Sequence, residues 1–255
     1  VAVTGGDCSN THALAQTLES EGLPCYPFSY PAERDEMLLR QEMARFAEIL
    51  GTNLEDAEKI RAHLEPVRKG LDALDDALVQ GRIPFAKYHA VALDSSDFAG
   101  DVDEYGKRVK NLVTTSRSVE PNTDGIPIAL LGVPPIIMDL PQLLEQFGLR
   151  VVLDEIPRQF TMPYREGPLE RQYTNYSYPY GMNYRLKDIA RQCRARGVRA
   201  VVHYTQTFCF RAIEDIVLRR ALDLPILTIE GDEPRHADAR LRLRLESFSE
   251  MLHGV

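Results

Sequence analysis

The sequence predicts an α/β protein with a parallel, doubly wound sheet, and the alternation of two kinds of segment supports this class. From residue 126 onward, short β-branched apolar runs alternate with longer segments in which apolar residues recur every three or four positions. A strand, a helix and a second strand in succession form a right-handed crossover, and repeated crossovers build a parallel sheet covered by helices. The alternation therefore favours this architecture over an all-helical or antiparallel one.

The clearest crossover unit lies between residues 197 and 232. Residues 200–204 and 226–229 are short apolar runs typical of strands. Residues 210–221 show helical spacing, with charges opposite an apolar face that is formed by Ile213, Ile216, Val217 and Leu218.

Cys209 stands where the first strand of this unit gives way to its helix. Parallel sheets bind ligands at the carboxyl ends of their strands. The N-terminus of a helix offers unpaired N–H groups and a partial positive charge, which favour a thiolate over a thiol. The position therefore predicts a cysteine placed for chemistry.

The remaining elements of this region follow the same rhythm. The pattern predicts strands at 126–132 and 150–156, a long loop after the second strand, and helices at 139–147, 183–196 and 238–252.

The N-terminal part begins with a strand at 1–6, followed by a helix that Asp7 or Ser9 can cap and that ends at Gly22. Cys8 thus occupies a strand-to-helix turn like that of Cys209. Residues 24–31 are rich in proline and aromatic residues and are expected to be extended. Because the first residues already have the pattern of a strand, we expect the given chain to begin inside a fold.

Residues 33–79 change character. Helical spacing predicts one helix that ends at Gly51 and a second from Asn53 or Asp56 to Val79, packed as an antiparallel pair. A strand or a helix is expected near residues 84–96 and a helix up to Val113. A turn-rich linker precedes residue 126.

Composition excludes several classes of protein. The 255 residues are 44% hydrophobic and 27% charged, and the net charge of −8 argues against a nucleic-acid or anionic-membrane partner. No apolar run approaches the roughly 18 residues of a membrane span, and no signal-peptide pattern is present, so the expected setting is the cytoplasm. The absence of GxGxxG and GxxxxGK[ST] patterns gives no indication of a dinucleotide or ATP phosphate site.

The four cysteines lie far apart, without a CxxC pair, which argues against a disulfide framework and structural zinc. They are either buried inert thiols or ligands gathered from distant turns. Cys193 lies within an amphipathic helix and is interpreted as a packing or surface thiol. Cys25 is a weaker ligand candidate than Cys8 and Cys209.

Several motifs resemble one known family over nearly the whole chain. They are DCSN at residues 7–10, LLGVPPI at 130–136, Phe208-Cys209, Leu224-Pro225 with Glu230-Gly231-Asp232, and RLESFSEM at 244–251. This order is similar to that of the 2-hydroxyacyl-CoA dehydratase and class I benzoyl-CoA reductase family, and in particular to the 2-hydroxyglutaryl-CoA dehydratase D-component.

The resemblance implies two flavodoxin-like lobes with a helical insert. The end of a first, partly present lobe would span residues 1–32, the insert and linker 33–124, and the second lobe 125–255. It also implies an iron–sulfur subunit of an ATP-dependent radical enzyme that acts on acyl-CoA thioesters. Its expected partners are a homologous second subunit and an ATP-hydrolysing iron–sulfur activator, with neither nucleic acid nor membrane.

Carried over by position, the resemblance makes Cys8 and Cys209 ligands of a 4Fe–4S cluster, with a third ligand upstream of Val1. Hydrogen bonds to cluster sulfurs and proton donation to a thioester oxygen are expected from neighbouring residues: Ser9, Asn10 and Thr207 for the former, and His12 and His203 for the latter.

Two questions stay open at the level of sequence. Dehydration and aromatic-ring reduction are both compatible with the family, and a tyrosine-rich segment slightly favours ring reduction if it lines an acyl pocket rather than simply packing: Tyr173, Tyr176, Tyr178, Tyr180 and Tyr184. The chain could instead be a double-cubane-type reductase of another small molecule, or a binding or scaffold subunit without a cluster.

Overall fold

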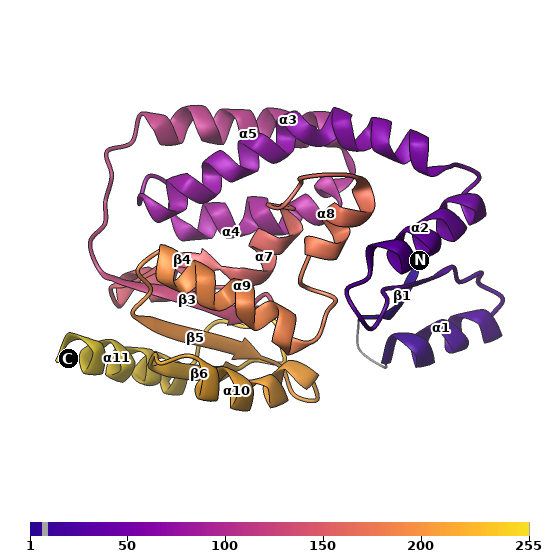
Figure 1. The fold of residues 1–255 in the computed structure, drawn as a ribbon. Coiled ribbons are helices and arrows are strands. Elements are labelled where there is room, and N and C mark those ends of the chain that lie inside the picture. Colours follow the sequence, from indigo (N-terminus) through magenta and orange to yellow (C-terminus); the bar gives the residue numbers. More distant parts are fainter. Residues whose placement is uncertain (7–9, 255) are drawn as a thin grey trace. The chain divides into compact units, whose positions relative to one another are not determined.

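The computed structural model describes residues 1–6 and 10–254. The chain forms two compact units (Figure 1). One, the N-terminal unit, comprises residues 1–65 and 162–185, and the other, the sheet unit, comprises residues 66–161 and 186–255. Both contain strands that pair in parallel and are joined by helices, which confirms the predicted α/β class.

The N-terminal unit is built on a short two-stranded parallel sheet in which Val3 is opposite Phe28. Its elements are β1 (Ala2–Gly5), α1 (Asn10–Ser20), β2 (Pro27–Ser29), α2 (Glu36–Ile49) and α8 (Leu169–Asn175), together with the first parts of α3 (Leu54–Val79) and α9 (Met182–Ala195).

Helix α2 begins at a side-chain cap, because Asp35 Oδ1 accepts the Leu38 N–H at 2.9 Å. The helix packs on β2 and α8, and Arg171 of α8 forms an ion pair with Glu36. Helix α3 in turn packs on α5 (Val102–Arg117), where the small Gly70 lets the Val109 side chain approach closely. Both helices lie at their predicted places, and their antiparallel pairing stays a prediction.

The sheet unit contains four parallel strands in the order β4-β3-β5-β6. Their bounds are β3 (Ile126–Gly132), β4 (Leu149–Asp154), β5 (Ala200–Thr205) and β6 (Ile226–Glu230). In chain order the strands are thus arranged second, first, third, fourth, which is the flavodoxin-like order. The sheet reverses its winding between β3 and β5, where His203 is opposite Leu131.

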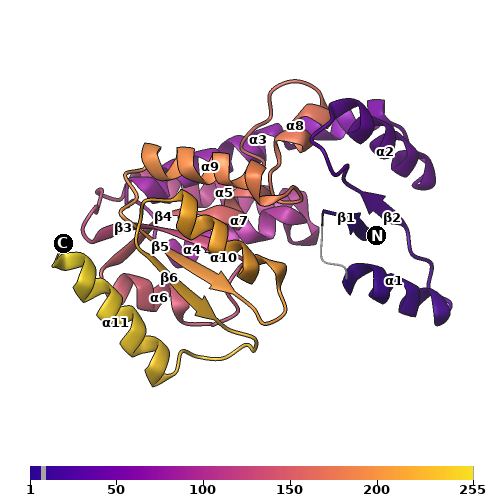
Figure 2. The same ribbon diagram turned by 60° about the horizontal axis from the view of Figure 1, so that its bottom comes forward.

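One face of this sheet carries the main apolar core. Buried side chains of β3, β4 and β5 meet those of α3, α4 (Phe85–Leu93), α5, α6 (Leu140–Gln146) and α11 (Ala239–His253). The segment near 84–96, for which a strand or helix was expected, is therefore a helix followed by the 3₁₀ turns Asp94–Ser96 and Phe98–Gly100. The other face is covered by α9 and α10 (Phe210–Ala221) (Figure 2).

Helix α10 is turned differently from the orientation that its apolar pattern indicates. Ile213 and Ile216 are 71% and 53% exposed, whereas Arg211 and Leu218 are 2% and 1% exposed. The reason is polar: the face toward the sheet carries Asp215, whose carboxylate reaches His203 of β5. A hydrogen-bonded contact between Asp215 and His203 thus accompanies this rotation of the helix.

The predicted long loop after β4 contains two short helices, α7 (Glu155–Phe160) and α8. Helix α7 is almost completely buried, including Ile156 and Pro157, so its apolar residues show no amphipathic period. Within the described residues, no helix has the combination of length and apolar character needed to span a membrane.

Candidate functional site

The carboxyl edge of the sheet unit is the candidate functional site. In sheets of this strand order, ligands bind outside the carboxyl ends of the strands where the winding reverses, here between β3 and β5. Gly132 ends β3, Thr205 ends β5 and Glu230 ends β6, so the turns that follow these residues form the site.

Gly132 is required by its backbone. Its φ of +97° lies in the left-handed region, and a Cβ at this position would lie 2.1 Å from the carbonyl oxygen of Tyr204. Its N–H donates to Oε2 of the buried Glu155 at 3.3 Å. Only glycine therefore allows β3 to leave the sheet this close to β5.

Cys209 is the N-cap residue of α10, as its predicted position at a strand-to-helix turn requires. Its backbone is extended, with φ −76° and ψ 129°, and its side chain makes no capping hydrogen bond. The half-buried thiol thus stands beside the first turn of α10, whose N–H groups favour negative charge. This arrangement leaves the sulfur available as a thiolate ligand or nucleophile.

Asp232 holds the turn that carries Cys209. The backbone N–H and the hydroxyl of Thr207 donate to the two Asp232 carboxylate oxygens at 2.6 and 2.5 Å. These hydrogen bonds lower the pKa of Asp232. Between Thr207 and Cys209, Phe208 has a left-handed φ of +63° and is 95% exposed. The backbone of the turn is therefore strained at a residue whose side chain makes few packing contacts.

His203 lies deeper in the sheet and is oriented by Asp215. Its Nδ1 is 2.8 Å from Asp215 Oδ1, and the same carboxylate accepts hydrogen bonds from Thr228 and Arg219. Burial raises the pKa of Asp215, but the hydrogen bonds from Thr228, His203 and Arg219 outweigh it and lower the pKa overall. Because an ionised carboxylate only accepts, the Nδ1–H of His203 donates to Asp215. That Nε2 is buried without a hydrogen-bond partner in the described part of the chain.

Tyr204 connects the loops on either side of β5. Its fully buried hydroxyl donates to the Gly231 carbonyl at 2.8 Å and accepts the Ile136 N–H at 3.3 Å. A Cβ on residue 231 would lie 2.5 Å from this hydroxyl, so Gly231 makes room for it. The loops after β3 and β6 thus share one anchor.

The N-terminal candidates are only partly described. Cys8 and Ser9 lie outside the described residues, and Asn10 is the exposed first residue of α1. His12 lies on α1, with Nε2 2.9 Å from the Thr4 carbonyl oxygen. Since a carbonyl only accepts, Nε2–H of His12 donates there and Nδ1 is left for other contacts.

The other described cysteines differ from Cys209. Cys193 is buried, and burial raises the pKa of its thiol to about 12, which fits the packing thiol predicted for it. The Cys25 thiol donates to the Ala15 carbonyl at 3.6 Å. Across residues 1–6 and 10–254, no group of three or more His, Cys, Asp or Glu side chains is arranged to hold a metal ion. Of the three described cysteines, Cys209 is best suited to be a thiolate ligand.

The tyrosine-rich segment packs on itself and on Tyr30, the residue that follows β2. Tyr176 stacks on Tyr178 with ring centroids 5.9 Å apart, and Tyr30 meets Tyr180 edge to face at 5.9 Å. The Arg34 guanidinium lies over the rings of Tyr180 and Tyr184. Burial raises the pKa of Tyr30, so the ring keeps its hydroxyl proton. Packing within the N-terminal unit therefore accounts for these tyrosines.

Together, the strand order and the cysteine at the switch point define a flavodoxin-like α/β protein with a thiol at its ligand-binding edge. The family model described as 2-hydroxyglutaryl-CoA dehydratase, D-component, matches residues 1–252, and the chain belongs to this family. This confirms the resemblance read from the motifs and makes the chain a subunit of a 2-hydroxyacyl-CoA dehydratase-type enzyme, for which the family implies a partner subunit and an activator. No curated protein sequence matches the chain.

Proposed function

We propose that this chain is the iron–sulfur subunit of a 2-hydroxyacyl-CoA dehydratase, with Cys209 and Cys8 as two ligands of a 4Fe–4S cluster. The observation that carries the proposal is the place of Cys209, an uncommitted thiol at a helix N-terminus on the switch-point edge of a flavodoxin-like sheet. Iron–sulfur clusters take cysteine thiolates, and the N–H groups of α10 favour that charge state.

The bound cluster would supply one-electron transfer to an acyl-CoA thioester, with electrons delivered by a separate ATP-hydrolysing activator. The protein's own part is to fix the ligand. Thr207 acts through the turn, because both of its donors are held by Asp232 and the turn directs Cys209. Ser9 and Asn10 would donate to cluster sulfurs. A homologous second subunit would complete the enzyme, and the reducing cytoplasm is the setting that such a cluster needs.

The two histidines are proposed to serve proton handling near the thioester. His203 is the better prepared, since Asp215 orients its ring through Nδ1 and leaves Nε2 for a proton or hydrogen bond to a thioester oxygen. His12 has one ring nitrogen bound to the Thr4 carbonyl and would act through the other. We favour dehydration over ring reduction, because the tyrosines that favoured ring reduction are accounted for by packing on one another.

The proposal is tested by iron and acid-labile sulfide in anaerobically purified protein, co-expressed with its partner subunit. Wild-type protein should carry about four irons per chain that are missing in Cys209→Ala. The matched control is Cys193→Ala, which removes a buried thiol of raised pKa and should keep its iron. Circular dichroism of each variant separates loss of the cluster from loss of the fold.

Iron retained in full by Cys209→Ala would contradict the ligand assignment. Wild-type protein without iron under strict anoxia would contradict the redox function and leave a binding or scaffold subunit. With activator, ATP and reductant, consumption of a 2-hydroxyacyl-CoA but not of benzoyl-CoA would support dehydration, whereas the reverse would establish ring reduction.

A further inference from the structure

A cavity opens at the amino edge of the sheet, the edge opposite Cys209. It has a volume of about 580 Å³, which is within the range of small-molecule sites. It lies between the turn from α3 to α4, the linker before β3 and the start of β4. Gly125 and Gly148, which immediately precede β3 and β4, both line it.

The walls of this amino-edge cavity are largely apolar. Its lining includes side chains that belong to the buried core of the sheet unit, namely Leu78, Ile83, Phe85, Leu149 and Val151. The apolar surface that stays exposed in this lining, at Pro84 and Val119, can take up an apolar or aromatic group, because apolar surface is then removed from water on both sides.

Three cations line the same cavity: Arg82, Lys87 and Arg150. Within the described residues, none of them forms an ion pair. Arg82 donates to the Val119 carbonyl and to Gln80 Oε1, and Arg150 donates to the Val79 carbonyl at 3.0 Å. All of these acceptors are neutral, so the positive charges are not compensated by the hydrogen bonds that the structure shows.

Arg150 is the most informative of the three. It is half-buried, its Nε is fully buried without a hydrogen-bond partner in the described part of the chain, and burial lowers its pKa. A desolvated cation without a counter-charge is costly. The same unit shows the usual solution at Arg196, whose guanidinium forms an ion pair with Asp75 at 2.5 Å. In a chain of net charge −8, a half-buried cation without an ion pair at a cavity wall offers a contact point for an anion from outside.

Two acids also line the cavity and limit the ligand's charge. Glu145 accepts the Phe85 N–H at 2.8 Å, so one of its oxygens is used at the start of α4. Asp124 lies on the exposed linker. Three cations and two acids leave one positive charge in the lining, which matches a monoanion better than a phosphate ester.

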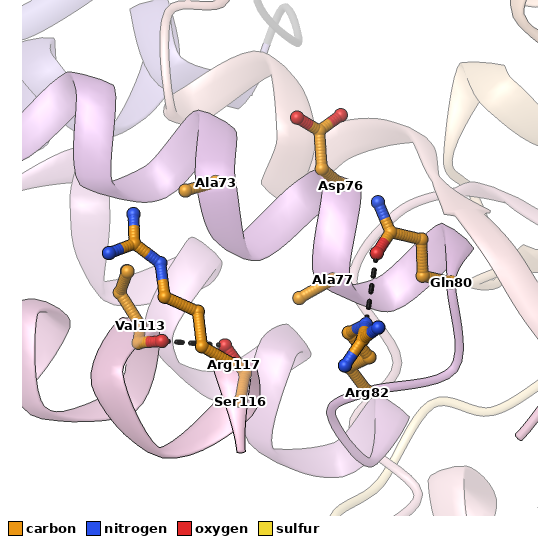
Figure 3. A pocket seen from close by; sticks show the side chains of 8 residues that line it. All are labelled: Ala73, Asp76, Ala77, Gln80, Arg82, Val113, Ser116 and Arg117. Atoms are coloured by element: carbon orange, nitrogen blue, oxygen red, sulfur yellow. Dashed lines mark hydrogen bonds between the residues drawn. The ribbon is translucent and has the colours of Figure 1, made fainter. Parts of the chain in front are cut away.

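A neighbouring hollow of about 340 Å³ between α3 and α5 shares Arg82 and is shown in Figure 3. There Arg82 is hydrogen-bonded to Gln80, and Asp76 stands on the α3 side. Its lining is mostly polar, with alanines and one valine as its apolar part, so it lacks the apolar walls of the amino-edge cavity.

We propose that the amino-edge cavity binds a monoanionic organic acid with an apolar or aromatic body. The carboxylate would pair with Arg150 and Lys87, and the body would lie against Pro84 and Val119, the exposed apolar residues of the lining. This site is separate from the edge that carries Cys209, and the proposal does not rest on the proposed function.

The test is titration of the full chain, purified with its partner subunit, with phenylacetate and with its neutral amide, phenylacetamide. We expect phenylacetate to bind with a Kd of about 1 mM or below and the amide at least about tenfold more weakly. Arg150→Gln and Lys87→Gln should each weaken phenylacetate binding about five- to tenfold. Lys87 is exposed, so its variant tests the site even if Arg150→Gln folds poorly.

Arg220→Gln is the matched control, because it removes an exposed arginine of α10 and should leave binding unchanged. Cys209→Ala should also bind phenylacetate as wild type does. Equal affinity for acid and amide, no binding up to about 10 mM, or unchanged binding in Lys87→Gln would overturn the proposal.

Discussion

The two edges of the four-stranded sheet differ in how their polar groups are satisfied. At the carboxyl edge, Thr207 is held by Asp232 and His203 by Asp215, so the polar side chains around Cys209 pair with one another. At the amino edge, Arg150 and Lys87 line a cavity without an ion pair in the described part of the chain.

This difference teaches what each edge is built to do. Internal pairing fixes a geometry before any ligand arrives, which suits the precise presentation of a thiol. Cations that form no ion pair within the described residues can instead pair with an anionic ligand. The carboxyl edge therefore presents the Cys209 thiol, whereas the amino edge is suited to bind an anionic ligand.

The largest expected effect comes from comparing one glycine at each edge. Gly132→Ala should lower the free energy of unfolding by about 3 kcal/mol or more, because its Cβ would collide with the Tyr204 carbonyl oxygen. Gly148→Ala should cost only about 1 kcal/mol, since its φ is also positive but nothing lies within 4 Å of the added Cβ. Urea unfolding at neutral pH measures both. Equal losses would show that the carboxyl edge is no more tightly built than the amino edge.

A second test addresses the internal pairing at the carboxyl edge. Asp215→Asn should cost about 2 kcal/mol at pH 7, since it weakens contacts with His203, Arg219 and Thr228. The pKa of Asp215 is lowered from its ordinary value of 3.8, so its contribution is present above that value and is lost as the pH falls through the lower folded-state pKa.

The measurement is urea unfolding of wild type and Asp215→Asn from pH 7 down to below about pH 4. The difference between them should shrink as the carboxylate is protonated. Asp223→Asn, at an exposed carboxylate just after α10, should change stability little at any of these pH values. A difference between wild type and Asp215→Asn that stays constant down to the lowest pH would contradict the ionised pairing.

The smallest expected effect concerns the turn before Cys209. Phe208→Gly should stabilise the chain by about 1 kcal/mol, because glycine accepts the left-handed φ and the exposed ring packs on little. Phe208→Ala keeps the backbone cost and should give no such gain. Thermal unfolding of both variants decides the matter, and a loss of stability in Phe208→Gly would show that the ring contributes contacts at this edge.

Much of the fold could be predicted because periodicity is a local property. The strands at 126–132, 200–205 and 226–230 and the helices α2, α3 and α10 lie close to their predicted positions. The rotation of α10 could not be predicted, because it depends on a contact between Asp215 of α10 and His203 of β5. The spacing of apolar residues along the helix carries no information about that contact. Helix α7 was missed because it is buried on all sides and has no amphipathic period.

The site was predictable to a similar degree. The place of Cys209 followed from the strand-to-helix pattern and is confirmed, while its role as a ligand stays a prediction. The pairing of Thr207 with Asp232 joins residues 25 positions apart and depends on β5 and β6 being neighbours. The amino-edge cavity had no signal in the sequence, since Arg82 and Lys87 lie near the start of α4 whereas Arg150 lies in β4, far along the chain.

The Tyr204 hydroxyl has a consequence for motion. Because one oxygen both donates to Gly231 and accepts from Ile136, the loops that leave β3 and β6 are tied to the same rigid strand. Neither loop can swing outward without breaking a hydrogen bond buried away from water, which is costly. Asp232 follows Gly231 directly and holds the turn that carries Cys209. A displacement of Ile136 would therefore shift Tyr204, then Gly231 and Asp232, and so the turn with the thiol. In this way β5 couples the motion of its two neighbouring loops.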